Sequence, residues 1–265
     1  MTRYSDRQEG LATLKTIDLN RKDYLLIHYS CESFYNKEDG KSPRITSIAV
    51  RKFDDGQTDL FAIHKTAEIK GIPFSEIENN YDEIEKAMLD KFFQFVQPNS
   101  GKKWIHWNMR DTNYGFKAIE HRYEVLGGFP TRIDDQNKID LSRLFIHLYG
   151  KRYIGNPRMI KLMEYNQINQ KDFLNGQEEA EAFANRNYIK LSMSTASKVD
   201  LFSNYLTQAI DKKLMVLTKK WELNGTSIIG KWYSFKETIF YKPLVLIVNI
   251  IIGIVLERFF ISRFF

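Results

Sequence analysis

The chain contains a single cysteine, Cys31, in 265 residues, so no disulfide can form within it. Few cysteines favour a reducing compartment, and the lack of CxxC or Cys/His clusters argues against structural zinc. No GxSxG, P-loop, HExxH or GxGxxG pattern occurs, which argues against hydrolase elbows, P-loop NTPases, zincins and dinucleotide enzymes. The N-terminal residues MTRYSDRQEG contain no apolar run, so we expect no secretory signal peptide.

Acidic residues are outnumbered by basic ones, which gives a formal net charge of +6. This balance suits contact with phosphates or with an anionic membrane surface. The basic residues are spread along the chain, however, and a solvated basic surface accounts for them equally well.

The spacing of apolar residues predicts an α/β fold. Dense apolar runs or strict alternation indicate strands, and recurrence every three to four residues indicates helices. Residues 1–22 indicate only a polar lead-in with about one helical turn. The predicted strands are 22–35, 44–53, 57–64 and 103–107. The predicted helices are 76–97, 113–126 and most of 178–217, and 138–150 begins as a strand and continues as a helix. Three antiparallel strands therefore lead into α/β alternation, in a mixed sheet flanked by helices.

Asn224-Gly225 lies between two β-rich arms, and this dipeptide predicts a small β-hairpin over residues 221–235. The chain then divides into an α/β body (1–217), a hairpin linker (218–236) and a C-terminal segment (237–265).

The C-terminal segment has the composition of a membrane helix. Residues 244–256 (LVLIVNIIIGIVL) carry no charge, and Asn249 is their only polar residue. These thirteen residues span about 20 Å as a helix, and apolar and aromatic flanks within 239–265 extend the run towards the roughly 30 Å of a bilayer core. Flanking lysines predict a single-pass anchor with the body in the cytoplasm. Asn249 and Gly253, one turn apart, suit a homo-oligomeric helix contact. A buried core helix is the alternative.

Three stretches of the body carry the residues of a possible active site. The first strand reads HYSCE and ends at Glu32. The region WIHWNMRDTNYGF places Asp111 after the fourth strand, and NYIKLSMSTASKVDLF contains Asp200. Together with the order of elements over roughly residues 20–215, these stretches resemble the ribonuclease H-like fold of DEDD-type 3′–5′ exonucleases. The resemblance implies catalytic roles for Glu32, Asp111 and Asp200, with Mg²⁺ or Mn²⁺ held by Glu32 and Asp111.

The family pattern is incomplete in this chain. Ser30 stands where the family has the Asp of its Asp-x-Glu motif, Ser194 replaces the Tyr or His of the third motif, and Lys198 or Val199 replaces the Asp. Asp200 serves only if the register slips. Two carboxylates cannot neutralise and fix two divalent ions as four do. We therefore expect a fold that retains the groove and has lost the reaction.

The residues around these motifs suit a nucleic acid end or a nucleotide. Aromatic faces stack on bases and cations attract phosphates. The expected binding residues are Trp107, Arg110, Tyr114, Lys117 and Lys198, with Arg152 and Arg158 from the basic segment 149–169. Several of the site candidates have a structural alternative. Glu32 also fits a surface carboxylate at a strand end, Asp111 a helix N-cap, and Trp107 a core. Segment 149–169 fits a solvated helix-loop-helix face equally well.

Three functions are compatible with this sequence. The first is a membrane-anchored, catalytically degenerate exonuclease-like module that binds nucleic acid or a nucleotide, an arrangement similar to bacterial defence or stress effectors. The second is an active metal-dependent nuclease. The third is a membrane-tethered protein–protein adaptor, whose basic surface serves only lipid headgroups.

Overall fold

The computed structural model describes the chain except residues 1, 33–41, 111–113, 226, 237 and 265, and the side chains after Glu257. The strands are β1 (Tyr24–Cys31), β2 (Ile45–Lys52), β3 (Thr58–Ala62), β4 (Lys103–His106) and β5 (Lys138–Asp140). The α-helices are α1 (Arg3–Leu19), α2 (Ile63–Ile69), α3 (Tyr81–Asn99), α4 (Phe116–Val125), α5 (Leu141–Tyr149), α6 (Arg158–Tyr165), α7 (Gly176–Ala184), α8 (Tyr188–Ile210), α9 (Ile228–Lys236) and α10 (Tyr241–Phe264). Short 3-10 turns occur at Arg21–Asp23, Phe74–Glu76, Asp135–Asn137 and Lys220–Glu222.

The five strands form one mixed sheet in the order β3-β2-β1-β4-β5. β2 is antiparallel to both β1 and β3, whereas β4 runs parallel to β1, and β5 runs parallel to β4. The predicted α/β class, with three antiparallel strands before the α/β alternation, is confirmed. From β1 the chain continues to β2 on one side of β1, whereas the parallel strand β4 lies on the other side. The carboxyl ends of β1 and β4 therefore flank a topological switch point. Open α/β sheets bind ligands at such points.

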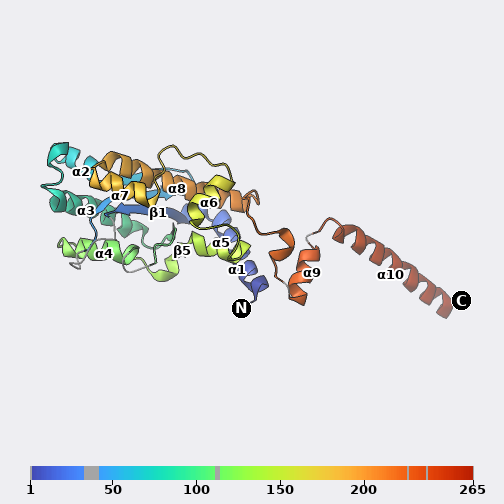
Figure 1. The fold of residues 1–265 in the computed structure, drawn as a ribbon. Helices are drawn as coiled ribbons and strands as arrows, with labels where there is room; N and C mark the ends of the chain where they lie inside the picture. The colour runs from blue at the N-terminus through green and yellow to red at the C-terminus, as the bar shows by residue number, and fades with distance from the viewer. Residues whose placement is uncertain (1, 33–41, 111–113, 226, 237, 265) are drawn as a thin grey trace.

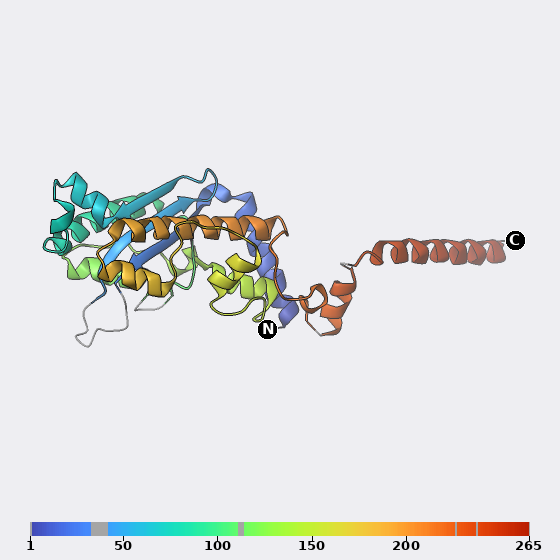
Figure 2. The same cartoon turned by 45° about the horizontal axis from the view of Figure 1, so that its top comes forward.

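Side chains of β1 alternate between the two faces of the sheet, and both faces are buried. Leu25, Ile27 and Tyr29 pack in a cluster with α3 and α4. Leu26 faces the opposite cluster, which is built from α1, α5 and α8. Figure 1 shows α3 and α4 on one side of β1 with α7 and α8 on the other, and in Figure 2 α8 lies across the strands. The body is therefore a helix–sheet–helix sandwich.

The N-terminal segment departs from the prediction of a polar lead-in. It forms the 17-residue helix α1, begun by a capping box at Thr2. Leu14 and Ile17 are buried against α5, and a Cβ on Gly10 would lie 3.1 Å from Leu148. The few apolar residues of α1 lie on one face but are too sparse to predict a helix from the sequence. The helix is stabilised mainly by packing against α5.

The predicted hairpin over 221–235 is wrong. Asn224-Gly225 does form a tight turn, with a φ of 76° at Gly225, but the turn leads into helix α9. Asn224 is buried, and its side chain contacts Arg7 and Ser234. The Asn-Gly dipeptide therefore predicted the turn correctly, but the contacts of the following segment with α1 favour a helix over a second strand.

The C-terminal helix α10 has 24 residues and extends away from the body in both views. Residues from Leu244 to Leu256 are largely exposed along it. Among the described residues, no single helix meets the length and hydropathy expected of a membrane span. The pair Ile228–Lys236 and Tyr241–Glu257 meets them only together, across a bend of 93°.

A buried ion pair fixes the start of β2 to the helices on one face. Glu85 of α3 is fully buried, and one of its carboxylate oxygens lies 2.6 Å from Nη2 of Arg122 in α4. The same carboxylate accepts a 2.6 Å hydrogen bond from the backbone N–H of Ile45. Burial raises the pKa of Glu85, and Arg122 opposes that rise. Glu85 has no exposed surface, so its charge depends on Arg122, whose guanidinium also reaches Asp82 at the surface.

Replacing Glu85 with alanine removes the buried carboxylate that faces Arg122 and leaves it only the exposed carboxylate of Asp82, 2.5 Å away. The backbone N–H of Ile45 also loses its acceptor. We expect the free energy of unfolding to fall by about 3–5 kcal/mol in urea denaturation followed by circular dichroism. Glu83→Ala is the control, because that side chain lies on the same helix, is 63% exposed and pairs with Lys70 at the surface. Its change should stay below about 1 kcal/mol. Equal losses in the two variants would contradict the role assigned to the buried pair.

Candidate functional site

A cavity of about 390 Å³ lies outside the carboxyl ends of β1 and β4. We call it the switch-point cavity. Its lining comes from β1, the residues after β4, the first turns of α5 and α6, and helices α7 and α8. The lining residues used below are His28, Trp107, Tyr114, Arg158, Glu179 and Lys198. The cavity therefore occupies the position at which sheets of this kind hold ligands.

An ion pair lies at the base of this cavity. Nζ of Lys198 in α8 is 2.7 Å from Oε1 of Glu179 in α7, and the lysine side chain is only 6% exposed. Burial lowers the pKa of Lys198, and the charge of Glu179 opposes that shift. Without the carboxylate, the ammonium group would lie buried and uncompensated.

Hydroxyl groups from two strands and α8 surround this pair. Oε1 of Glu179 also accepts hydrogen bonds from Ser30, at 3.0 Å, and from Ser194, at 3.1 Å. Oγ1 of Thr195 lies 2.8 Å from Oγ of Ser30 and 2.7 Å from Oγ of Ser47. The network thus joins β1, β2, α7 and α8 through buried polar groups that satisfy one another.

Aromatic residues form one wall. Tyr114 stacks on Tyr29 with the ring centroids 4.7 Å apart, and its hydroxyl lies 3.4 Å from Nδ1 of His28. Nε2 of His28 is buried and has no hydrogen-bond partner among the described residues. Burial, reinforced by the charge of Lys198, holds the pKa of His28 well below its usual value, so the ring is neutral at pH 7. This wall therefore carries Nε2 of His28, without a described hydrogen-bond partner, beside the ring of Tyr114.

Trp107 and Arg158 complete the lining in different ways. Trp107 is 5% exposed and stacks on Phe202 in the core, so only its edge reaches the cavity. Arg158, at the start of α6, lies over the Tyr153 ring and donates a hydrogen bond to the backbone of Lys151. Its Nε is buried without a described partner. Arg158 thus supplies a cation at the rim of the cavity.

The predicted carboxylates do not meet at this cavity. Glu32 lies 3.5 Å from the Arg44 guanidinium, and Asp200 lies 2.8 Å from that of Arg51. Arg44 directly precedes β2 and Arg51 lies near its end, seven residues or about 23 Å along the chain at 3.3 Å per residue. Two carboxylates placed at opposite ends of one strand cannot share a metal ion. Asp111 lies outside the described residues.

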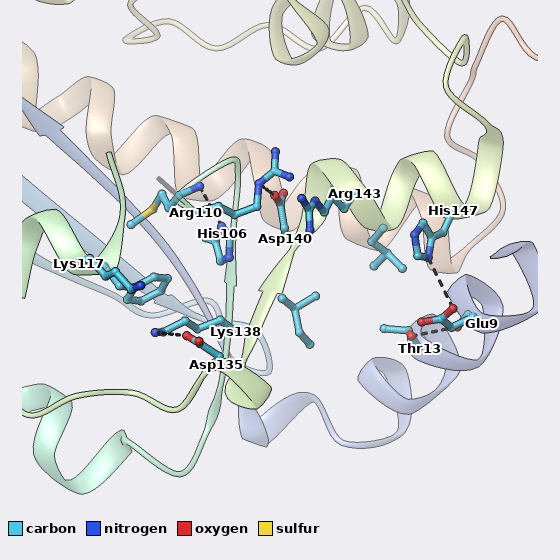
Figure 3. Close-up of a pocket in the computed structure, with 14 residues that line it drawn as sticks. Glu9, Thr13, His106, Arg110, Lys117, Asp135, Lys138, Asp140, Arg143 and His147 are labelled. Atoms are coloured by element: carbon cyan, nitrogen blue, oxygen red, sulfur yellow. Dashed lines mark hydrogen bonds and ion pairs between the residues drawn. The ribbon is translucent and has the colours of Figure 1, made fainter. Parts of the chain in front are cut away.

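Two of the predicted cations line a different cavity, of about 710 Å³, which we call the α5 pocket. Figure 3 shows Arg110 turned towards Asp140, 2.6 Å away, and Lys117 on the opposite side near the Lys138–Asp135 pair. Burial lowers the pKa of His106 in its wall to about 4. Arg152, another of the five predicted cations, is exposed and lines neither cavity.

The described lining of the switch-point cavity does not suit a metal ion. Within the part of the chain that the structure describes, no group of three or more His, Cys, Asp or Glu side chains could hold a metal ion. At the base of the cavity, the carboxylate of Glu179 is already paired with an ammonium group that repels cations. The described residues there do not fit a divalent ion. The Mg²⁺ or Mn²⁺ site expected from Glu32 and Asp111 stays a prediction.

Sequence reasoning missed Glu179, the residue on which the site depends. The signal was indirect. Lys198 falls on the same helical face as Leu191, Thr195 and Phe202, all buried, so a carboxylate partner was required. Nothing in the sequence says which of the many acidic residues supplies it.

Comparisons of this chain with protein-family models, curated proteins and solved structures find no match. The case for a function therefore rests on the geometry of the cavity and the chemistry of its lining.

The dependence of Lys198 on Glu179 can be tested through pH. In Glu179→Gln the pKa of Lys198 falls further, and we expect a loss of about 3 kcal/mol in unfolding free energy at pH 7. Between its folded and unfolded pKa values this lysine binds fewer protons when folded, so stability rises with pH across that window. The substitution extends this pH window to lower values. The loss in unfolding free energy relative to the parent protein should therefore shrink as the pH rises towards about 10, where the lysine is neutral in both the folded and the unfolded state.

Urea denaturation at a series of pH values measures this effect. Glu181→Gln, an exposed change on the same helix, is the control. A loss in Glu179→Gln that does not vary with pH would show that Lys198 does not depend on this carboxylate.

Proposed function

We propose that the chain is a membrane-anchored, exonuclease-like domain that has lost the two-metal reaction and binds a nucleotide, free or at the end of a single strand, in the switch-point cavity. The observation that carries the proposal is the Lys198–Glu179 pair at the base of a cavity on the carboxyl side of β1 and β4. It joins a cation, aromatic faces and a switch-point position in one site.

The size and lining of the cavity support a ligand of this class. A volume of about 390 Å³ lies in the range of small-molecule sites. The Tyr114 ring offers an aromatic face for a base, and Arg158 offers a charge-assisted hydrogen bond to phosphate at the rim. The free Nε2 of His28 suits a polar group of the base or sugar.

The loss of the reaction is supported by what stands at the motif positions. The order of three antiparallel strands followed by parallel β4 is the order on which the resemblance to DEDD-type exonucleases rests. At the first motif, the hydroxyl of Ser30 donates to Glu179 in place of a carboxylate that would bind metal. At the third motif, Lys198 brings a positive charge. Both replacements favour phosphate binding over metal binding.

The length of α10 supports the anchor. Its 24 residues extend about 36 Å, compared with a hydrocarbon core of about 30 Å, and its described part reaches the hydropathy of a span only together with α9. Its central residues are exposed to solvent, as expected of a helix that packs against lipid. The lysines that precede it favour an orientation with the body on the cytoplasmic side. Asn249 and Gly253 offer a contact through which anchors of several copies associate.

Titration of a fluorescent single-stranded oligonucleotide and of a nucleoside triphosphate tests the binding site. We expect Arg158→Gln to weaken binding on the order of tenfold and to reduce its salt dependence, because a phosphate contact is lost. Lys65→Gln is the control, since it removes the same charge from an exposed position on α2. Arg152→Gln then reports whether the strand continues beyond the cavity.

Two outcomes would overturn the proposal. No binding of either probe would leave the membrane-tethered adaptor as the function. Metal-dependent cleavage of the oligonucleotide that is lost in Glu32→Ala would make the protein an active nuclease instead.

A further inference from the structure

Helix α9 presents apolar side chains to solvent on the side turned away from the body. Ile228 is 88% exposed, Ile229 59% and Trp232 51%. At 100° per residue these three side chains lie within one arc of the helix, which we call the outer face of α9. An apolar surface of this kind on a nine-residue helix needs a covering partner.

The opposite face of α9 is small and polar, and it is docked on the body. Gly230 is buried so closely that a Cβ there would lie 2.1 Å from the carbonyl oxygen of Asn224. Ser234 lies on the same side and accepts a hydrogen bond from the Asn224 side chain. Tyr233 packs against Tyr4 of α1, with the ring centroids 4.5 Å apart. The outer face is therefore held outward by specific contacts.

The sequence around α9 is rich in lysine. Between residues 218 and 242 the sequence has five lysines and two glutamates, a net charge of +3. Lys231 lies at one margin of the outer face and is exposed. Lys236, in the last turn, lies 5.4 Å over the Trp232 ring. Aromatic and aliphatic side chains flanked by lysines match the boundary between lipid headgroups and acyl chains.

The angle between α9 and α10 suits the same environment. The two helices meet at 93°, across a short connection. A helix perpendicular to a membrane-spanning helix lies in the plane of the membrane. With α10 along the membrane normal, α9 is therefore placed at the headgroup level.

We propose that α9 is an interfacial helix that lies on an anionic lipid bilayer, with its outer face at the acyl boundary and Lys231 and Lys236 on lipid phosphates. The inference rests on the proposed membrane anchor and adds a second contact to it. Because α9 is docked on α1, this contact holds the body at a fixed orientation. Arg3 of α1 donates hydrogen bonds to the backbone of His147 and Leu148 and so ties that orientation to α5.

Quenching of Trp232 by lipids brominated near the headgroup end of the acyl chain tests the placement. The full chain is reconstituted into vesicles of phosphatidylcholine, with or without phosphatidylglycerol. The Trp221→Phe background removes the other exposed tryptophan, and Trp104 and Trp107 are buried in the body. The signal remaining in Trp221→Phe/Trp232→Phe is subtracted. We expect Trp232 to be quenched, more strongly in vesicles that contain the anionic lipid.

Charge reversal separates lipid recognition from simple proximity. Lys231→Glu/Lys236→Glu should lose most of the additional quenching in anionic vesicles, because each lysine near an anionic surface contributes to binding. Lys171→Glu/Lys190→Glu makes the same change in charge at exposed positions of the body and should keep it. Raising the salt concentration should reduce the additional quenching in the parent protein.

Flotation of the same vesicles distinguishes the two proposals. Protein that floats with the vesicles and resists alkaline extraction while Trp232 stays unquenched would overturn the interfacial helix and leave the anchor intact. Protein that does not float would overturn the anchor and this inference with it. Quenching that is equal in neutral and anionic vesicles and unchanged by charge reversal would overturn the role of anionic lipid.

Discussion

The body is organised around one electrostatic constraint, the need of the buried Lys198 ammonium for a carboxylate. Glu179 meets that need from a different helix, so α7 must lie against α8 for the charge to be tolerated. The same carboxylate oxygen accepts hydrogen bonds from Ser30 and Ser194, which ties the two helices to β1. The position of one charge thereby fixes three elements and shapes the cavity between them.

This constraint also links the fold to the proposed function. A divalent ion bound by carboxylates and an ammonium group bound by a carboxylate both place positive charge at the carboxyl end of the sheet. The ammonium group is compensated by Glu179 and supplies no Lewis acidity to activate water, so on our proposal Arg158 at the rim is the cation that attracts a phosphate. On our proposal, the chain keeps the electrostatic attraction of an exonuclease groove and gives up its chemistry. Tyr114 and the free ring nitrogen of His28 then serve recognition alone.

The opposite end of the molecule is built on docking rather than on charge pairing. Helix α1 packs on α5, and through Tyr4 and Arg7 it also contacts the segment that carries α9. The first turn of α5 belongs to the lining of the switch-point cavity, through Ser142. Helix α1 therefore connects the α5 side of the cavity to α9. On our proposal, the contact of α9 with lipid fixes the orientation of the cavity relative to the membrane.

The sequence by itself determined the elements whose stability is local or strongly patterned. Alternating and continuous apolar runs predicted the strands and their order, and the helical spacing of Ile84, Met88 and Phe92 predicted α3. These patterns are reliable because a strand or helix must bury its apolar side whatever partner covers it. Trp107, Tyr114, Arg158 and Lys198, which line the switch-point cavity, were among the binding candidates that the sequence offered, because cationic and aromatic side chains are visible in it.

Only the tertiary structure decided which of those residues meet. It paired Lys198 with Glu179, placed Asp200 beside Arg51, and divided four of the predicted cations between two cavities while leaving Arg152 outside both. The tertiary structure also decided that residues 3–19 form a full helix and that the Asn224-Gly225 turn leads into α9. Both helices depend on packing partners that are distant in sequence, α5 for α1 and α1 for α9. Local propensity does not predict pairs such as Lys198–Glu179, because their interaction energy arises only when folding brings the two side chains together.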